Sequence, residues 1–144
     1  MKVADVLKVK GSGVSTTSPD TRVARATERL RLERIGALVV STDGQRVDGI
    51  ITEHEIVSSL ARFGGDLLQM RVSDVMSRSV RTCSLEDPVR AVMSQMTTAR
   101  VRHVIVLDHG KLSGIVSIGD VVKSCLDDAD LEVRVLRDAY LGHR

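Results

Sequence analysis

The chain has 144 residues, of which 42% are hydrophobic and 28% are charged, an ordinary balance for a globular domain. It contains one Phe, one Tyr and no Trp, so its core must be aliphatic and it lacks the aromatic platforms on which single-stranded nucleic acids stack. The net charge of +2 comes from interspersed signs, and no apolar run approaches the roughly 20 residues that a membrane-spanning helix needs, so neither nucleic acid nor a membrane is expected as a partner.

The first half of the chain predicts three strands and two helices. In order, the elements are a strand at 14–17, a helix started by 18–21, strands at 37–41 and 47–51, and a helix after Thr52. Pro19 and Asp20 are typical of a helix start, and apolar residues at three- and four-residue spacing give that helix one core stripe. Asp43-Gly44 is typical of the turn of a hairpin.

The second half repeats this pattern. Shifted by 66 residues, the stretch from Val14 falls on the stretch from Val80, and the offset becomes 65 after the hairpin turn. The corresponding elements are a strand at 80–83, a helix started by 86–88, strands at 103–107 and 112–116, and a helix after Ser117. Gly64-Gly65 interrupts the periodicity and indicates the boundary between the two repeats.

The last helix continues beyond the length of its counterpart in the first repeat. Its apolar residues recur at three- and four-residue spacing, at Val122, Cys125, Leu126, Ala129, Val133 and Leu136. Such a stripe, flanked by mixed charges, favours a contact between copies of the chain over a membrane surface. We therefore expect a homodimer to which this helix contributes.

The fold class expected is α/β (α+β), with the order strand, helix, strand, strand, helix occurring twice. One three-stranded unit is too small to bury a good core, so two units should pack through their sheets. The predicted division is repeat 1 at 1–62, a linker at 63–71, repeat 2 at 72–126 and a helical extension at 127–144.

Cysteine and histidine patterns give no sign of a metal site. Cys83 and Cys125 lie among apolar neighbours without a Cys-x-x-Cys motif, which favours a reduced, cytoplasmic protein. The N-terminus lacks the apolar run of a signal peptide. The histidines without ligand spacing, expected at the surface, are His54, His109 and His143.

One motif occurs twice. GIITEHEIV at 49–57 and GIVSIGDVV at 114–122 each combine a buried strand, a hydroxyl residue, a carboxylate three positions later and an apolar helix. Both are compatible with a capping box, in which the hydroxyl and the carboxylate satisfy backbone N–H groups at the helix start. A ligand site is the alternative, because a helix N-terminus attracts phosphate and a carboxylate can bind a ribose diol.

Together with VADVL, VSDVM and RVRHVIVLDHGKLSG, these two motifs resemble a tandem pair of CBS domains, also called a Bateman module. The resemblance covers nearly the whole chain. Within the family, the chain is similar to the stand-alone bacterial members. It implies two repeats related by pseudo-two-fold symmetry, an adenosine ligand (AMP, ADP, ATP, NAD or S-adenosylmethionine) between them, and a regulatory, non-catalytic role. It also implies a dimer and an effector protein that the sequence does not identify.

The resemblance assigns the stronger nucleotide site to the second repeat. Asp120 corresponds to the ribose ligand and Ser117 to a phosphate contact, while Arg102 and His103 provide basic groups for phosphate. The base should contact Thr82 and Ile105. We expect the backbone N–H of Ile105 to be available.

A weaker site is expected in the first repeat. Its residues are Thr16, Ala37, Thr52 and Glu55, and Gly36-Ala37 stand where the second repeat has its basic pair.

The alternatives to nucleotide sensing are a structural or adaptor protein and a nucleotide-processing enzyme. A structural or adaptor protein would have empty clefts and simply capped helices. A nucleotide-processing enzyme would need a Gly-rich phosphate loop, a nucleophile–base pair or a metal cluster, and the sequence indicates none of these.

Overall fold

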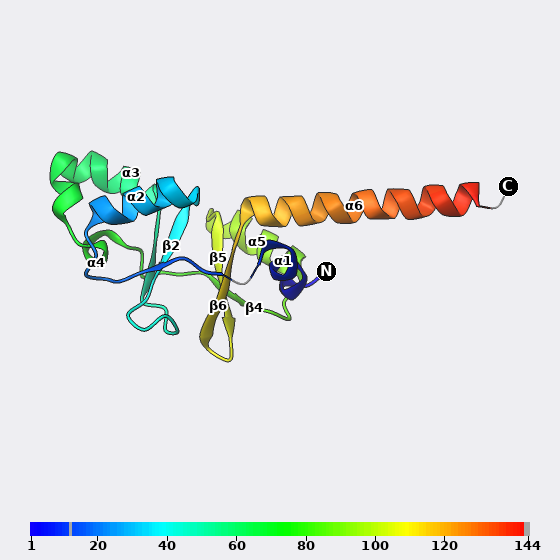
Figure 1. Cartoon of the computed structure of the whole chain (residues 1–144), viewed down its shortest axis with the longest axis horizontal. Helices are drawn as coiled ribbons and strands as arrows, with labels where there is room; N and C mark the ends of the chain where they lie inside the picture. Colours follow the sequence, from blue (N-terminus) through cyan, green and yellow to red (C-terminus); the bar gives the residue numbers. More distant parts are fainter. Residues whose placement is uncertain (12, 143–144) are drawn as a thin grey trace.

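The computed structural model describes residues 1–11 and 13–142. Two sheet-and-helix units lie side by side, and a long C-terminal helix projects from the second (Figure 1). The last two positions of the predicted extension, His143 and Arg144, lie outside the described residues.

The first unit contains a three-stranded sheet in the order β1-β2-β3. Its strands are β1 (Thr16–Thr17), β2 (Ala37–Val40) and β3 (Gly49–Thr52), and its helices are α2 (Val23–Glu33) and α3 (Glu53–Phe63). β1 runs parallel to β2, and β3 runs antiparallel to it. The helix α3 ends where Gly64 adopts a positive φ of 60°, a conformation that favours glycine, so the predicted break at this point is confirmed.

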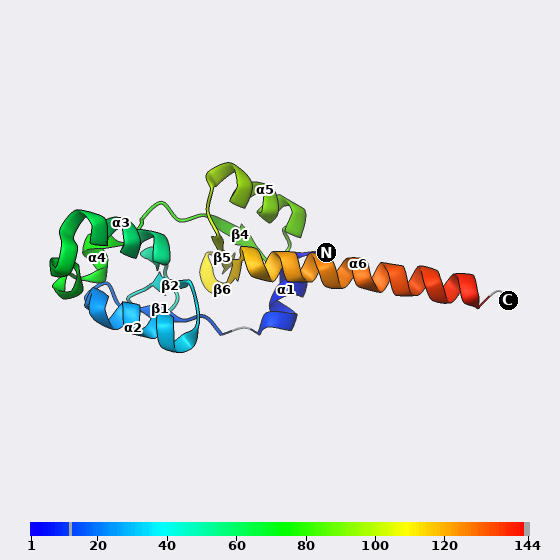
Figure 2. The ribbon, with the colours of Figure 1, turned by 90° about the horizontal axis from the view of Figure 1, so that it is seen from above.

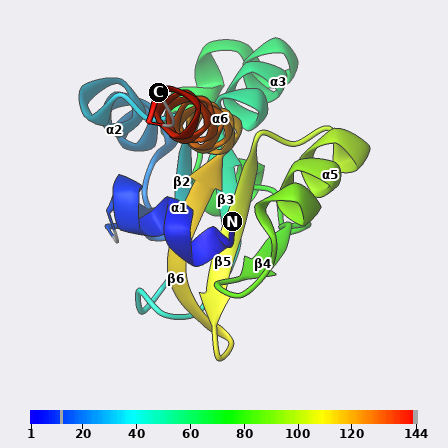
Figure 3. The ribbon, with the colours of Figure 1, turned by 90° about the vertical axis from the view of Figure 1, so that its right-hand side faces the viewer.

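The second unit repeats this arrangement. Its strands β4 (Thr82–Ser84), β5 (His103–Asp108) and β6 (Lys111–Ser117) form a sheet in that order, with the helices α5 (Val89–Ala99) and α6 (Ile118–Leu141). Figure 3, which looks along α6, shows α5 and α6 around this sheet. The predicted element order is confirmed, as is the extended last helix. Within the described residues, no helix is both long and apolar enough to cross a membrane.

The two units are held together through their sheets. Successive residues of a strand face opposite sides, so Leu38 and Val40 pack under the helices of the first unit while Ala37 and Val39 face the other way. These two join Ile105 of the second sheet in a shared buried cluster. The predicted packing of sheet against sheet is therefore confirmed.

Two short helices exchange partners between the units. The first, α1 (Val3–Lys10), begins the chain but fills the core of the second unit, where the Val3 N–H donates to the Asp87 carbonyl at 2.9 Å. The other, α4 (Val72–Val75), follows the 3₁₀ helix η1 (Gly64–Gln69) and places Val72 in the core of the first unit. Because each core contains a helix from the other half of the sequence, neither core is complete alone.

The predicted helix starts need a correction. α2 begins after Arg22 and α5 after Pro88, and in both cases the preceding side chain makes no capping hydrogen bond. Ser18 and Asp87 instead stabilise the turns before the helices. The Ser18 hydroxyl accepts from the Asp20 N–H at 3.3 Å, and the Asp87 carboxylate accepts from the Ser84 N–H at 2.9 Å.

Candidate functional site

A cleft of about 590 Å³ lies between the two units, within the range typical of small-molecule sites. Its walls come from both repeats. The first repeat contributes the start of α3, and the second contributes the turns before β4 and β5. The polar and charged lining residues include Thr52, Glu53, His54, Glu55, Arg81, Arg100, Arg102 and His103.

The wall from the first repeat is the joint between β3 and α3. Thr52 precedes the helix, and its hydroxyl oxygen accepts from the His54 N–H at 3.2 Å. The same hydroxyl donates to the Glu55 carboxylate at 3.0 Å. Glu55 is half-buried and lies in the first turn of the helix. Thr52 thus caps the helix, but Glu55 binds its hydroxyl instead of completing a capping box.

The opposite wall is basic. Arg81 lies just before β4, and Arg100 and Arg102 lie in the turn between α5 and β5. Among the hydrogen bonds and ion pairs of the described residues, none engages any of these three guanidinium groups. The cleft therefore has a wall of cations that are available to an anion.

His103 stands at the start of β5, half-buried, with its ring against Gly36. A Cβ added at Gly36 would approach the ring to 3.2 Å, so the glycine leaves the space that the imidazole occupies. Burial and the nearby Lys10 lower the pKa of His103, and Arg102 lowers it further. The carboxylates of Asp120 and Glu53 raise this pKa, but by less. With its pKa below the ordinary value of 6.5, His103 is largely neutral at pH 7.

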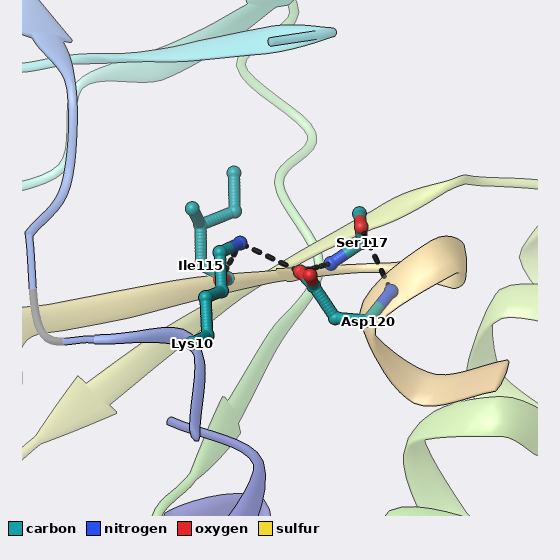
Figure 4. Close-up of polar contacts among 4 residues, drawn as sticks. All are labelled: Lys10, Ile115, Ser117 and Asp120. Atoms are coloured by element: carbon teal, nitrogen blue, oxygen red, sulfur yellow. Dashed lines mark hydrogen bonds and ion pairs between the residues drawn. The ribbon is translucent and has the colours of Figure 1, made fainter. Parts of the chain in front are cut away.

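The second joint, between β6 and α6, has a different environment (Figure 4). The Ser117 N–H donates to the Asp120 carboxylate at 2.8 Å, and the Asp120 N–H donates to the Ser117 hydroxyl at 3.2 Å, which completes a capping box. Lys10, at the end of α1, donates to Asp120 Oδ2 at 2.6 Å and to the Ile115 carbonyl at 2.7 Å. Oδ2 of the Asp120 carboxylate therefore accepts from two protein groups, the Ser117 N–H and the Lys10 ammonium group.

Electrostatics agree with this geometry. The side chains of Lys10 and Asp120 are only 30% and 23% exposed. Burial raises the pKa of Asp120, but the bonds from Lys10 and from the Ser117 N–H outweigh it and hold the pKa below the usual value. Asp120 is thus a fixed anion balanced by Lys10.

Two of the residues expected at the stronger site lie between the two joints. The Ile118 N–H donates to the Arg102 carbonyl at 2.9 Å, and His103 is paired with Ser117 in the sheet register, so both basic residues lie beside the second joint. They also line the cleft that contains Thr52 and Glu55, whereas Ser117 and Asp120 are not among the lining residues of that cleft in the described structure. The pseudo-two-fold packing sets the start of β5 against the joint of the other repeat as well.

The expected base contacts are also changed. Ile105 is fully buried between the sheets, and its N–H donates to the Arg81 carbonyl at 2.9 Å, so the expectation of an available N–H is wrong. Thr82 is exposed and lies opposite Ile105 in the sheet register. In the first repeat, Ala37 is buried opposite Thr52, and the Thr16 carbonyl accepts from Arg29.

Sequence reasoning missed Lys10, Arg81 and Arg100. The number of arginines gave no signal, since the second repeat has five and the first repeat has seven. Lys10 carried no signal either, because its contact with Asp120 joins residues 110 positions apart.

Comparison with known proteins agrees with this architecture. The family model of the CBS domain matches residues 4–62 and 72–127. The mitochondrial CBS domain-containing protein CBSX3 of Arabidopsis thaliana is 31% identical over 147 residues, which cover 96% of this chain and 71% of that protein.

Solved structures give the same result. A CBS-domain containing protein from Agrobacterium tumefaciens is 40% identical, with a TM-score of 0.83, and the match covers 86% of this chain and 98% of the other. A CBS domain protein from Pyrobaculum aerophilum, complexed with AMP, is 23% identical with a TM-score of 0.72 over 83% of this chain and 89% of the other. The second match is a likeness of fold alone.

Two repeats that exchange short helices and enclose a cleft with one basic wall define a paired module built from tandem βαββα units. The chain belongs to the CBS domain family, and both of its repeats match that family.

Proposed function

We propose that this protein is a regulatory module that binds an adenosine nucleotide (AMP, ADP, ATP or NAD) in the cleft between its repeats and acts on a separate effector protein. The observation that carries the proposal is the cleft itself. Three guanidinium groups, for which the described residues provide no hydrogen bond or ion pair, face a hydroxyl–carboxylate joint across a cleft of about 590 Å³.

Each part of a nucleotide has a matching group. Arg81, Arg100 and Arg102 suit phosphate, because a guanidinium group can bind it through two parallel hydrogen bonds. Glu55, on the opposite wall, can accept hydrogen bonds from a ribose diol once the Thr52 hydroxyl turns away. Apolar lining residues for the base are Ile50, Val57, Val80 and Val101.

The complex of the Pyrobaculum aerophilum relative with AMP supports this ligand class, since an adenosine phosphate fits a related fold. It does not distinguish among AMP, ADP, ATP and NAD for this chain.

One ligand per chain is expected from the open cleft. At the second joint Lys10 already neutralises Asp120 and bonds the neighbouring Ile115 carbonyl. Both bonds that the carboxylate accepts reach Oδ2, so a ribose would have to bind Oδ1 beside an ion pair whose side chains are less than one-third exposed.

Regulation would follow from the position of the ligand. A nucleotide that contacts Glu55 on one repeat and Arg102 on the other binds more tightly to the packing that brings these walls together. It therefore shifts the population of packings. The proposed readout is an altered surface presented to the effector by a homodimer, and no catalytic step is needed.

A nucleotide panel tests the proposal. At about 100 times its dissociation constant, a ligand stabilises a protein by roughly 2.7 kcal/mol, or several degrees in melting temperature for a chain of this size. We expect such a rise for at least one of AMP, ADP, ATP and NAD. The double variant Arg100→Ala/Arg102→Ala should lose it, whereas Arg90→Ala, an exposed arginine outside the cleft, should retain it.

Two results would overturn the proposal. If no adenosine compound stabilises the native chain, the clefts are structural and the adaptor function is favoured. If the double variant responds as the native chain does, the basic wall does not hold phosphate.

A further inference from the structure

The second half of α6 extends away from the body of the protein (Figure 2). The helix has 24 residues and is therefore about 36 Å long, at roughly 1.5 Å per residue. Near its start, Val121 is buried against the second unit and Cys125 packs on the same core. Beyond that point its apolar side chains lie in water.

Six apolar side chains of α6 form a regular seam, and the exposed Leu131, Val135 and Leu141 lie outside it. Val122, Leu126, Ala129, Val133, Leu136 and Tyr140 recur at alternating spacings of four and three. That is the heptad repeat of a coiled coil, with Leu126, Val133 and Tyr140 at its a positions and the others at d. Three seam residues, Leu126, Val133 and Leu136, are 61%, 54% and 70% exposed.

The body of the protein leaves the seam accessible. Neighbouring helical residues differ by about 100° in direction, given 3.6 residues per turn. The side chain of Val122 therefore points about 100° away from that of the buried Val121. The seam thus runs along the helix beside the face that packs on the second unit.

Charges on the helix discriminate between possible partners. Most have an opposite charge four positions away on the same helix, as Asp130 has with Arg134. Asp128, Glu132 and Arg137 are different, because the charges at three or four positions from them are of their own sign. Of these three, Glu132 and Arg137 flank the seam. Within the described residues, no ion pair joins two charges of α6, so Glu132 and Arg137 have no partner on their own helix.

A second copy of the helix would supply what one copy lacks. In a parallel, in-register pair, a g residue meets the e residue five positions later on the other helix. Glu132 is at g and Arg137 is at e, so each pair of copies gains two opposite-charge contacts. An antiparallel pair with the same overlap, Leu126 opposite Leu136, would instead bring Glu132 beside Glu132 and Asp130 beside Asp130.

We propose that α6 forms a parallel, in-register two-stranded coiled coil with a second copy of this chain, and that Glu132 and Arg137 determine its orientation. This pairing does not depend on the occupant of the cleft, so its failure and the failure of nucleotide binding are separate results.

Charge reversal tests the pairing on the full chain. Sedimentation velocity should show a dimer for the native chain and at least a tenfold weaker dimer for both Glu132→Arg and Arg137→Glu, since each variant places like charges together. Mixing the two variants should restore the dimer, because the Arg at 132 then faces the Glu at 137 and the reverse contact is native. Asp138→Arg, on the helix face away from the seam, is the control and should dimerise normally.

Cross-linking tests the orientation. In a Cys125→Ser background, Ala129→Cys lies at a d position and should form a disulfide with its counterpart under mild oxidation. The antiparallel pair would instead cross-link a mixture of Ala129→Cys and Val133→Cys, which would overturn the proposal. A native chain that is monomeric, or a dimer unchanged by both single charge reversals, would overturn it as well.

Discussion

The two strand–helix joints have nearly the same sequence pattern, yet they meet different surroundings. Thr52 and Glu55 face an open cleft with an arginine wall supplied by the other repeat. Asp120, in the second joint, is bonded by its own capping box and by Lys10 from α1. A hydroxyl and a carboxylate three residues apart therefore do not define a binding site by themselves. The groups brought by distant segments determine whether the joint is open to a ligand.

The largest effect is expected at the closed joint. Asp120→Ala removes the bond to the Ser117 N–H and leaves Lys10 without its counter-ion, which should lower the free energy of unfolding by about 2 kcal/mol. Urea denaturation measures this loss. Asp128→Ala, an exposed aspartate on the same helix, is the control, and equal stability of the two variants would contradict a structural role for Asp120.

A smaller effect is expected for Lys10→Ala. Asp120 keeps its capping bonds in this variant, so the loss of stability should be only about 1 kcal/mol. Its carboxylate is then accessible, and calorimetry with AMP should detect a second, weaker binding event. Lys8→Ala, on the same helix, should leave both stability and stoichiometry unchanged. A Lys10→Ala variant that still binds one ligand would show that Lys10 does not close the second joint.

At the open joint, loss of the cap should cost less. Thr52→Ala removes the acceptor for the His54 N–H, and a lost N-cap destabilises a helix by roughly 0.5–1 kcal/mol. Thr52→Ser keeps the hydroxyl and should restore stability. Chemical denaturation of the two variants measures the difference. A Thr52→Ala loss as large as that of Asp120→Ala would remove the contrast between the joints.

The smallest effect concerns pH. The pKa of His103 lies below 6.5 in the folded protein, so folding disfavours the protonated ring and the free energy of unfolding should fall as the pH drops below about 6.5. A bound phosphate favours the protonated ring, so nucleotide affinity should rise two- to threefold between about pH 8 and pH 6. Calorimetry at several pH values measures this slope.

The groups that face His103 are Lys10, Asp120, Glu53 and Arg102. The phosphate of the ligand titrates in the same range, so His103→Gln is the control that removes only the contribution of the ring. An unchanged slope in that variant would exclude His103 from the phosphate contact.

Much of the fold could be predicted from the sequence because it depends on local patterns. Apolar spacing located the helices and strands, and Gly64-Gly65 indicated where the helix α3 ends. The internal repeat then required two small sheets to share a core, as Ala37, Val39 and Ile105 do.

The site was harder to predict because its walls come from different repeats. Alignment of the repeats set Gly36 against Arg102 and suggested that the first repeat lacks a basic group. In the folded chain, Gly36 instead makes room for His103 of the other repeat. The contact between Lys10 and Asp120 depends on the exchange of α1 into the second core, which no local pattern indicates.

The most direct test compares the two carboxylates in one titration. Isothermal calorimetry with AMP, or with the nucleotide that the panel selects, should be run on the native chain, Glu55→Gln and Asp120→Asn. We expect Glu55→Gln to weaken binding at least tenfold and Asp120→Asn to bind within about twofold of the native chain. Native affinity in Glu55→Gln together with loss of binding in Asp120→Asn would contradict the assignment of the open cleft as the nucleotide site.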